Sequence, residues 1–499
     1  MPQAIHNIIG GQSVASTSGR TSPVFNPATG EQSGELGLSS AAEVNAAVQV
    51  AKAALPEWAN MPPLKRARMM FKYKALLDDN AENIARILCS EHGKTFDDAL
   101  GEVTRGVEVV EYACGIPELL KGDYTRNVGP EIDSFNDRQP LGVCAGITPF
   151  NFPAMVPMWM FPMAVACGNT FLLKPSERDP SATNLIVELF HQAGFPAGVL
   201  NVVHGDKEAV DALLHNPDVK AISFVGSTPI AEYVYTTGCA NGKRVQALGG
   251  AKNHMVVMPD ADMNQVADAL MGAGYGSAGE RCMAISVAVP VGEETADRMI
   301  EALEPRVRAL KVGPATDLES EMGPLVTKQH MDKVLGYINE GEKEGAKLVV
   351  DGRGLNLQGY EGGYFVGGTL FDDVTTDMTI YKEEIFGPVL SVVRTPDFQS
   401  AVKIINDHEY GNGTAIFTRD GDAARSFVDS IEVGMVGVNV PIPVPVAYHS
   451  FGGWKRSIFG SHGVYGPEGV HFYTRLKTVT ARWPTGIKEG AAFAFPTIE

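Results

Sequence analysis

The segment that decides the fold is "VKAISFVGSTPIAEYVY", residues 219–235. It starts with a short, mostly apolar run that is typical of a buried strand. Gly226, Ser227 and Thr228 then predict a tight turn, and Pro229 suits the first turn of a helix. At such a turn, a glycine lets a phosphate group approach the backbone N–H groups at the helix start. Because the segment lacks the GxGxxG fingerprint, an ordinary strand–helix turn accounts for it equally well.

Similar short runs surround this segment and alternate with stretches of helical pattern. They are "LGVCAGITPF" (141–150), "GNTFLLKPSE" (168–177), "VLNVVHG" (199–205) and "KRVQALGG" (243–250). A second alternating series follows residue 254. This alternation predicts an α/β protein with two domains, each built on a largely parallel sheet between helices.

Two segments lie outside this alternation. Apolar residues recur at three- and four-residue steps and predict an amphipathic helix: Leu100, Val103, Val107, Val110 and Cys114. The segment "GVHFYTRLKTVTARW" (469–483) has the pattern of one long strand. Because the sequence shows no partner for it, we expect it to pair across a subunit interface.

Length, charge and cysteine spacing limit the possible functions. A chain of 499 residues is too long for one ordinary core, so two or three domains are expected. The formal net charge of -18 makes binding to nucleic acid or anionic lipid unfavourable. No apolar run reaches the roughly 18 residues of a membrane span, and the first residues do not have the pattern of a signal peptide. Six widely separated cysteines indicate reduced thiols in a cytoplasmic protein and no metal site.

The run "LLKPSERDP" (172–180) ends a predicted buried strand with charged residues. Open α/β sheets bind ligands at the carboxyl ends of their strands, so Lys174 and Glu177 could hold the hydroxyl groups of a ribose. A glutamate there disfavours a 2′-phosphate and favours NAD over NADP, although Arg178 weakens that inference. A solvated ion pair explains the same residues and is favoured when the run is considered alone.

Two further motifs contain polar groups suited to catalysis. In "TPFNFP" (148–153), the Asn151 amide could donate a hydrogen bond to a developing oxyanion. In "SAGERCMAIS" (277–286), Cys282 follows Arg281, and nearby positive charge favours the nucleophilic thiolate. A turn asparagine and a buried structural cysteine are the commoner explanations of each motif by itself.

Taken together, the motifs resemble those of the aldehyde dehydrogenase superfamily in order and approximate spacing. The resemblance rests on "TPFNFP", "KPSE", "FVGST", "ALGGAKN", "GERCMAIS" and "KEEIFGPVLSV", and it covers essentially the whole chain. Within the superfamily, the chain is most similar to the CoA-acylating methylmalonate-semialdehyde dehydrogenases. The similarity is carried by residues 151–180, by "LGGAKNHMVVMPDAD" (248–262) and by the ending "FGGWKRSIFG…GPEGVHFYTRLKTVTARW".

The resemblance implies a role for each motif. Cys282 would be the nucleophile, and Asn151 with the backbone N–H of Cys282 would form the oxyanion hole. NAD would contact Phe150, Lys174, Glu177, Arg178, Gly226, Ser227, Gly249, Glu384 and Phe386, with Glu384 on the nicotinamide ribose and Phe386 near the nicotinamide ring. Arg105 and Arg281 would bind the substrate carboxylate, since the fork of an arginine matches a carboxylate. For Arg105, a surface ion pair with Glu102 or Glu108 is the plainer explanation.

One departure from the wider superfamily bears on the reaction. Ala247 stands immediately before "LGG", where hydrolytic members have the glutamate that activates water. An alanine cannot accept a proton, so a thioester on Cys282 would await coenzyme A instead. The expected reaction is oxidation of methylmalonate or malonate semialdehyde to propionyl-CoA or acetyl-CoA with loss of CO₂. A CoA-independent hydrolytic semialdehyde dehydrogenase and a catalytically silent member of the same fold are the alternatives.

The resemblance also implies the division of the chain. Residues 1–123 and 147–253 would form a Rossmann-type NAD-binding domain, and residues 254–448 would form the α/β catalytic domain. Residues 124–146 and 449–499 would supply a small β oligomerisation element and the C-terminal tail. A homodimer or homotetramer is expected.

Overall fold

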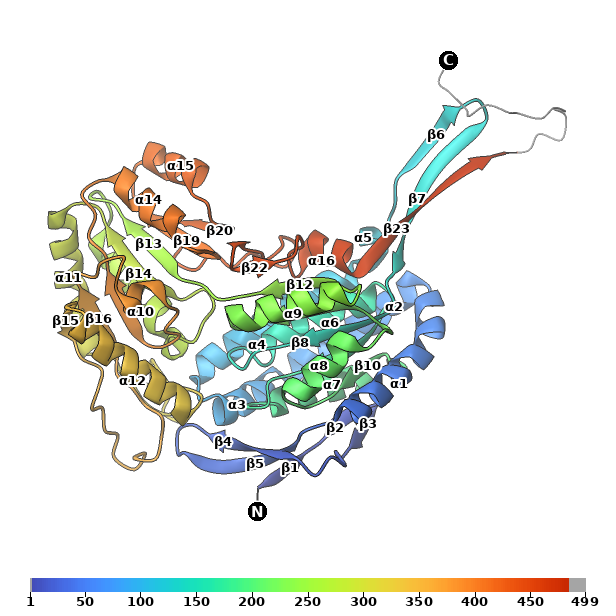
Figure 1. The fold of residues 1–499 in the computed structure, drawn as a ribbon, viewed down its shortest axis with the longest axis horizontal. Coiled ribbons are helices and arrows are strands. Elements are labelled where there is room, and N and C mark those ends of the chain that lie inside the picture. The colour runs from blue at the N-terminus through green and yellow to red at the C-terminus, as the bar shows by residue number, and fades with distance from the viewer. Residues whose placement is uncertain (1, 484–499) are drawn as a thin grey trace.

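The computed structural model describes residues 2–483, which form two lobes and a projecting arm (Figure 1). One lobe is built on an eight-stranded sheet, the second on a seven-stranded sheet, and the arm on three strands. The expected α/β class with two largely parallel sheets is confirmed.

The eight-stranded sheet has the order β22-β12-β11-β8-β9-β10-β2-β3. Its five central strands, from β12 to β10, are parallel, while β22, β2 and β3 run antiparallel to their neighbours. The strands are β2 (Asn7–Ile9), β3 (Gln12–Val14), β8 (Val143–Ile147), β9 (Thr170–Lys174), β10 (Leu200–Val202), β11 (Val219–Val225), β12 (Arg244–Leu248) and β22 (Ile458–Phe459). A separate small sheet holds β1 (Gln3–Ile5), β4 (Thr21–Asn26) and β5 (Glu31–Gly37).

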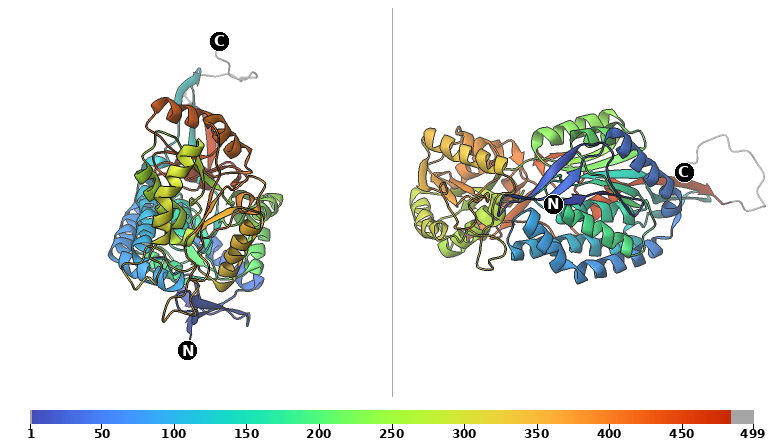
Figure 2. Two further views of the ribbon diagram at one scale, coloured as in Figure 1. Left: turned by 90° about the vertical axis from the view of Figure 1, so that its left-hand side faces the viewer. Right: turned by 90° about the horizontal axis from the view of Figure 1, so that it is seen from below.

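Helices cover both faces of the eight-stranded sheet (Figures 1 and 2). They are α1 (Ala41–Asn60), α2 (Pro63–Asp79), α3 (Ala81–Glu91), α4 (Phe96–Cys114), α5 (Ile116–Leu119), α6 (Met155–Ala166), α7 (Ser181–Gln192), α8 (Lys207–His215), α9 (Thr228–Ala240) and α16 (Gly466–Tyr473). The strand and helix predicted from residues 219–235 are β11 and α9, with Pro229 in the first turn of the helix. The helix predicted from residues 100–114 is α4.

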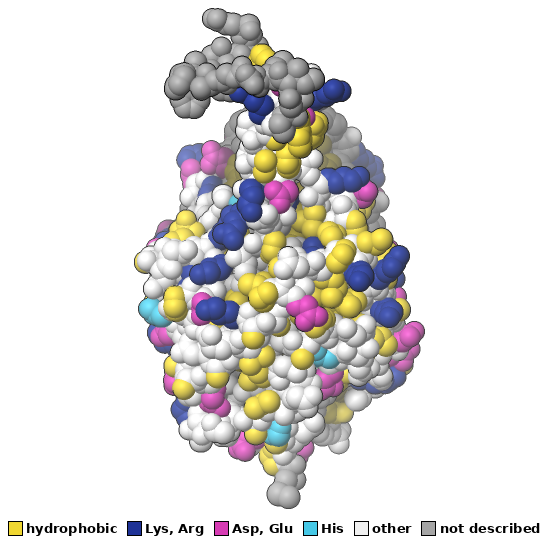
Figure 3. Space-filling view, turned by 90° about the vertical axis from the view of Figure 1, so that its right-hand side faces the viewer, with side chains coloured by type: hydrophobic (Ala, Val, Ile, Leu, Met, Phe, Trp, Pro, Cys, Tyr) yellow, Lys and Arg dark blue, Asp and Glu magenta, His cyan; other side chains and the backbone are white. Residues whose placement is uncertain are grey.

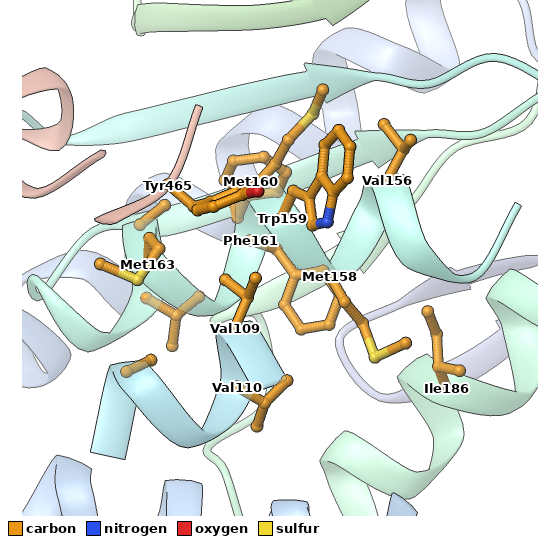
Figure 4. Close-up of a cluster of buried hydrophobic side chains, with 14 of the residues drawn as sticks. Val109, Val110, Val156, Met158, Trp159, Met160, Phe161, Met163, Ile186 and Tyr465 are labelled. Atoms are coloured by element: carbon orange, nitrogen blue, oxygen red, sulfur yellow. The ribbon is translucent and has the colours of Figure 1, made fainter. Parts of the chain in front are cut away.

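Helix α6 is the centre of this lobe, because all twelve of its residues are buried. Figure 4 shows its side chains against those of α4, including Val109 and Val110. The two helices approach closely at Gly106, where a Cβ atom would lie 2.3 Å from Cε of Met158. The segment Asn151–Ala154 leads directly into α6, so the packing of α4 on α6 also fixes the position of Asn151.

The seven-stranded sheet has the order β15-β16-β17-β14-β13-β19-β20, and only β15 is antiparallel to its neighbour. Its strands are β13 (Asn253–Val257), β14 (Ile285–Pro290), β15 (Lys347–Val350), β16 (Thr369–Asp372), β17 (Val389–Val392), β19 (Gly413–Phe417) and β20 (Met435–Val438). Its helices are α10 (Met263–Tyr275), α11 (Glu293–Arg308), α12 (Lys328–Lys343), α13 (Thr379–Lys382), α14 (Phe398–Asp407) and α15 (Gly421–Ser430). A two-stranded pair, β18 (Tyr410–Gly411) with β21 (Trp454–Lys455), lies beside it.

The arm consists of β6 (Tyr124–Gly129), β7 (Ile132–Pro140) and β23 (Thr474–Arg482), and it projects from the body in both views of Figure 2. The prediction that the tail strand lacks a partner within the chain is wrong, because β23 pairs antiparallel with β7 over nine residues. The strand is also shorter than predicted. Residues 466–473 form helix α16, for which Pro467 in the first turn supplies a start signal.

One predicted boundary shifts as well. Residues 143–146, which the sequence grouped with the oligomerisation strands, belong to β8 in the middle of the eight-stranded sheet. The sequence of a five-residue apolar strand does not indicate which sheet the strand joins. The last residues of the predicted tail, 484–499, lie outside the described residues. Among the helices of residues 2–483, none is long and apolar enough to cross a membrane.

Candidate active site

The cysteine motif lies in a strained turn between α10 and β14. Ser277 and Ala278 both adopt left-handed backbone conformations, with φ of 53° and 52°, and Gly279 follows with φ of 72°. A Cβ atom on Gly279 would lie 2.1 Å from the Gly387 carbonyl oxygen, so this turn packs directly on the segment that follows Phe386. Non-glycine residues in this conformation cost energy and are found mainly at functional sites.

Cys282 and Asn151 are brought together from two different lobes. The Asn151 Nδ2 group donates to the Glu280 carbonyl at 2.8 Å and lies 3.4 Å from the Cys282 Sγ atom. Burial raises the pKa of the Cys282 thiol, whereas the Asn151 amide and the backbone N–H of Cys282 act to lower it. The site therefore places the Asn151 amide donor beside the thiol, close to where an oxyanion would form on a carbonyl carbon bound to the sulfur.

Two asparagines that the sequence analysis did not single out hold the cysteine backbone. Asn253 Nδ2 donates to the carbonyls of Cys282 and Ala284 at 2.9 Å each. Asn412 Nδ2 also donates to the Cys282 carbonyl, at 3.0 Å. These contacts join β13 and the segment before β19 to the start of β14, so they depend on the tertiary fold.

A buried ion pair that the sequence analysis did not predict holds Asn151. Lys94 Nζ lies 2.6 Å from Glu102 Oε2 and donates to the Asn151 carbonyl at 2.8 Å. The other carboxylate oxygen of Glu102 accepts from the backbone N–H groups of Ala154 and Met155, at the start of α6. Both side chains of the pair are fully buried. Glu102 is thus not the surface partner of Arg105 that helical spacing allowed.

Cys282 lines a small pocket formed by residues 251–389, most of them from the lobe with the seven-stranded sheet. Its lining includes Ala251, Asn253, Gly279, Arg281, Glu384, Phe386 and Gly387. Five of the residues predicted from sequence therefore meet at or beside this pocket: Cys282, Asn151, Arg281, Glu384 and Phe386. Within the described part of the chain, Glu384 supplies the one carboxyl group on this lining.

Glu384 is held against the turn that follows β12. Its Oε1 atom accepts from the Ala251 N–H at 3.0 Å. Burial raises the pKa of Glu384 to about 7. The buried ammonium group of Lys252 donates to the carbonyls of Ile380 and Glu383, and so fixes the segment that carries Glu384.

A group of rings lies beside the pocket. The Phe150 ring stands edge-on to Phe386, with centroids 5.9 Å apart, and the guanidinium of Arg178 lies 5.9 Å from the Phe150 ring. His330 and His92 each lie 6.3 Å from the same ring. His330 Nε2 is 2.6 Å from the Phe386 carbonyl, an acceptor, so this nitrogen carries the proton. The predicted residues Phe150, Arg178 and Phe386 are thus brought together.

The remaining predicted residues lie at the ends of the parallel strands. Lys174 ends β9 and forms a 3.1 Å ion pair with Glu177. Ser227 is exposed at the start of α9, whose first N–H groups receive no side-chain cap. Gly226 and Gly249 are both tightly packed, since a Cβ atom would lie 2.6 Å from the Phe224 ring and 2.8 Å from the Arg456 carbonyl, respectively. The turn and helix start can receive a phosphate group.

Comparison with known proteins agrees with this geometry. The sequence pattern that defines the aldehyde dehydrogenase family matches residues 14–479. The chain belongs to the aldehyde dehydrogenase family. A malonate-semialdehyde dehydrogenase from Pseudomonas aeruginosa is 63% identical over 495 residues, which is 99% of each chain. A malonate-semialdehyde dehydrogenase from Halalkalibacterium halodurans is 51% identical over 481 residues, 96% of this chain and 99% of that protein.

Solved structures of the family superpose closely on this one. A Sinorhizobium meliloti protein complexed with NAD, named provisionally as a methylmalonate-semialdehyde dehydrogenase, gives a TM-score of 0.97 at 60% identity. The methylmalonate-semialdehyde dehydrogenase of Oceanimonas doudoroffii gives 0.96 at 60% identity. Each comparison covers 98% of this chain and 100% of the other. The expected fold and family are confirmed.

The two predicted arginines of this aldehyde dehydrogenase have different surroundings. Arg281 lines the pocket, and its Nη2 atom lies 2.6 Å from Asp98 Oδ1 on α4. Although burial raises the pKa of Asp98, Arg281 and Lys94 lower it overall. Arg105 is instead paired with Glu108 and donates to the carbonyls of Val444 and Pro445. The contacts within the described residues do not join Arg105 to the pocket.

Ala247 lies inside the eight-stranded sheet of this aldehyde dehydrogenase. It is fully buried in β12, beside Phe224 of β11 and Phe459 of β22. Ala247 is not one of the residues that line the pocket at Cys282. Among the described residues that line the pocket, Glu384 carries the one carboxyl group that could act as a hydrolytic base.

Proposed function

We propose that this aldehyde dehydrogenase oxidises malonate or methylmalonate semialdehyde with NAD and transfers the acyl group to coenzyme A, with loss of CO₂. The observation that carries the proposal is the single pocket in which Cys282 lies beside the Asn151 amide, with Arg281 on its wall. A thiol next to oxyanion donors suits attack on an aldehyde, and an arginine suits a carboxylate at the other end of a short substrate. The names of the relatives support the same substrate class.

The strand ends are suited to NAD. The uncapped start of α9 offers backbone N–H groups to a pyrophosphate. Lys174 and Glu177 at the end of β9 are suited to ribose hydroxyl groups. Thr228 Oγ1 accepts from the Gly250 N–H at 2.8 Å, and the Ala251 N–H donates to Glu384, so the proposed phosphate and nicotinamide-ribose sites are connected through the adjacent residues Gly250 and Ala251.

In the proposed reaction, the Cys282 thiolate forms a bond to the aldehyde carbon, and the carbonyl oxygen becomes an oxyanion. The Asn151 amide and the Cys282 N–H stabilise this oxyanion. When bound, NAD supplies the acceptor for the hydride that leaves the same carbon. The thiol of coenzyme A then displaces Cys282 from the resulting thioester, which restores the free cysteine. Release of the substrate carboxylate as CO₂, with a proton taking its place on the same carbon, leaves acetyl-CoA from malonate semialdehyde and propionyl-CoA from methylmalonate semialdehyde.

Two features favour coenzyme A over water as acyl acceptor. Ala247 replaces the glutamate that the resemblance places before "LGG" in hydrolytic members, and Glu384, the one carboxyl group on the described pocket lining, already accepts from the Ala251 N–H. With a pKa of about 7, however, Glu384 is partly ionised at neutral pH and can serve as a base. Hydrolysis through Glu384 is therefore the specific alternative.

Product identification tests the proposal directly. Malonate semialdehyde and NAD are mixed with the enzyme with and without coenzyme A, and products are identified by mass spectrometry. We expect acetyl-CoA and CO₂ with coenzyme A, and only slow NADH formation without it. Free malonate formed at the full rate in the absence of coenzyme A would establish the hydrolytic alternative. Absence of NADH formation with every aldehyde tested would instead point to a catalytically silent protein.

Replacing Arg281 with leucine is expected to lower kcat/KM for malonate semialdehyde by about 10- to 100-fold, the usual effect of losing a charge-assisted hydrogen bond. For propanal, which lacks the carboxylate, kcat/KM should change by less than about 3-fold in the same variant. The measurement is NADH formation with each aldehyde at saturating NAD. Equal losses for both substrates would show that Arg281 does not bind the carboxylate.

The matched control is Arg105→Leu, which removes the second predicted carboxylate ligand. Because Arg281 lines the pocket at Cys282 and Arg105 does not, a smaller selective loss is expected in Arg105→Leu. A larger selective loss in Arg105→Leu than in Arg281→Leu would reassign the carboxylate site to the α4 surface.

We further propose that the lobe with the eight-stranded sheet binds NAD, that the lobe with the seven-stranded sheet is catalytic, and that the arm mediates assembly into a homodimer or homotetramer. Hydrophobic side chains lie along the arm and continue onto the face beneath it (Figure 3). Tyr124, Leu476 and Trp483 of the arm region are each more than half exposed. Apolar side chains exposed in this way mark association surfaces. A monomer in light scattering would contradict the assembly.

A further inference from the structure

Glu280 lies two residues before Cys282, and the proposed reaction gives its carboxyl group no role. Its side chain is 0% exposed. It follows directly on the left-handed turn of residues 277–279. A fully buried carboxyl group is rare in proteins unless its neighbours give it a role.

The carboxyl group packs against two other segments of the chain. Its Oε1 atom accepts from the Val326 N–H at 3.3 Å and lies 3.7 Å from His330 Nε2. Its Oε2 atom lies 3.9 Å from His92 Nε2 and makes no hydrogen bond in the described structure. Glu280 thus connects the cysteine turn to the segment before α12 and to the end of α3.

These segments also contact Phe386 and Asn151, which lie beside the Cys282 thiol. His330 binds the Phe386 carbonyl. His92 is two residues from Lys94, which donates to the Asn151 carbonyl. The backbone carbonyl of Glu280 accepts from the Asn151 side chain at 2.8 Å. Glu280 is therefore linked to Asn151 directly through its main chain and indirectly through the segment packed beside its side chain.

The orientation of the Asn151 amide depends on that carbonyl. Asn151 Oδ1 is buried and makes no hydrogen bond in the described structure, so no donor holds the oxygen side of the amide. The nitrogen side has two partners, the Glu280 carbonyl and the Cys282 Sγ atom. If the 280–281 peptide turned, Nδ2 would lose its stronger partner, and its direction toward the reacting carbon would no longer be fixed.

We propose that Glu280 is a positioning residue for the oxidation reaction: its side chain anchors the cysteine turn so that the Glu280 carbonyl holds the Asn151 amide beside the Cys282 thiol. The inference rests on the proposed roles of Cys282 and Asn151. The anchor requires a hydrogen-bond acceptor at the position of Oε1 but no negative charge.

The surroundings favour an uncharged anchor. Burial raises the pKa of Glu280 well above its usual range, against the smaller opposing effects of the Val326 N–H, Lys94 and Arg178. Burial likewise lowers the pKa of His92 and of His330, so neither ring supplies a cation near neutral pH. A neutral acid beside neutral imidazoles avoids the cost of an unpaired buried charge.

Three variants separate anchoring from charge. Glu280→Gln keeps the acceptor and removes the ionisable proton, so kcat for NADH formation should stay within about 3-fold of the parent enzyme. Glu280→Leu removes the acceptor and should lower kcat by at least about 10-fold, part of the 10²- to 10³-fold effect of losing an oxyanion donor. Glu280→Asp keeps the acid but shortens the reach to Val326, and it should resemble Glu280→Leu. The KM for NAD should change by less than about 3-fold in all three.

A double-mutant cycle with Asn151 tests whether Glu280 acts through that amide. Asn151→Ala together with Glu280→Leu should lose no more activity than Asn151→Ala alone, because the positioned group is already absent. The matched control is Glu91→Leu. It removes another buried carboxyl that accepts one backbone N–H, from Ser181, and its contacts within the described part of the chain do not reach Asn151 or Cys282. This variant should lower the melting temperature and leave kcat within about 3-fold.

Several results would overturn the positioning role of Glu280. Equal kcat losses in Glu280→Gln and Glu280→Leu would show that the acid itself takes part in the reaction and would overturn the proposal. Unchanged kcat in Glu280→Leu, or additive losses in the double variant, would overturn it as well. If the Leu variant does not fold, the comparison of Gln with Asp still decides between anchoring and charge. If Cys282 is not the nucleophile, the Cys282→Ala variant will retain turnover, and this result is independent of the Glu280 variants.

Discussion

Replacement of Cys282 with alanine is expected to reduce NADH formation by at least about 10⁴-fold, because loss of the attacking atom leaves only binding and oxyanion stabilisation. The Asn151 amide and the pocket lining remain in place in this variant. NAD affinity, measured by fluorescence titration, should therefore be unchanged. The experiment compares initial rates of NADH formation with malonate semialdehyde and with propanal.

The control is Cys239→Ala, which removes an exposed thiol of the same chain. Its activity should equal that of the parent enzyme. Substantial turnover in Cys282→Ala, with either aldehyde, would show that another group attacks the substrate and would remove the basis of the proposed mechanism.

The protonation state of Cys282 gives a second measure of the same site. Because burial raises the pKa of this thiol, the thiolate fraction in the unliganded enzyme is small at neutral pH. The rate at which iodoacetamide modifies Cys282 can be followed by mass spectrometry of the peptide. This rate should still increase with pH at pH 9.0, the ordinary pKa of a thiol. Asn151→Ala should slow the modification at neutral pH, since the amide acts to lower this pKa.

Replacement of Glu102 with alanine is expected to destabilise the protein by about 3–5 kcal/mol, because it leaves the buried ammonium of Lys94 without its carboxylate. The loss also removes the acceptor of the Ala154 and Met155 N–H groups at the start of α6. Chemical unfolding followed by circular dichroism measures the free energy. Activity should fall too, since Lys94 holds the Asn151 carbonyl.

Two controls separate charge from packing. Lys94→Met with Glu102→Gln removes both charges and keeps an acceptor for α6, so most of the stability should return. Glu118→Ala removes an exposed glutamate paired with Lys121 and should change stability by less than about 0.5 kcal/mol. A loss below about 1 kcal/mol in Glu102→Ala would mean that the buried pair is not required by the fold.

The sequence alone determined the fold class and the two central catalytic candidates. The strand, turn and helix of residues 219–240 are specified by apolar runs, a glycine turn and a helix-start proline, all within about twenty residues. The order of the motifs determined the family, and thereby Cys282 and Asn151 as a pair. Their proximity depends on long-range packing, and the sequence predicted it only through the resemblance to the family.

Sequence reasoning failed where a residue's role depends on what packs against it. Glu102 has the spacing of a surface partner for Arg105, yet it is buried against Lys94 and caps α6. Arg105 pairs instead with Glu108. The final strand had no visible partner, because β7 lies more than 300 residues earlier in the chain.

Only the tertiary structure could decide the surroundings of Glu280. In the sequence it is one charged residue in "SAGERCMAIS", and charged residues are usually solvated. Folding encloses it between His92 at the end of α3 and the stretch from Val326 to His330 at the start of α12, two segments far from it in the chain. Local patterns determine which elements form, because helix and strand signals act over a few residues. Burial, and with it the charge and contacts of a side chain, is determined by how distant elements pack.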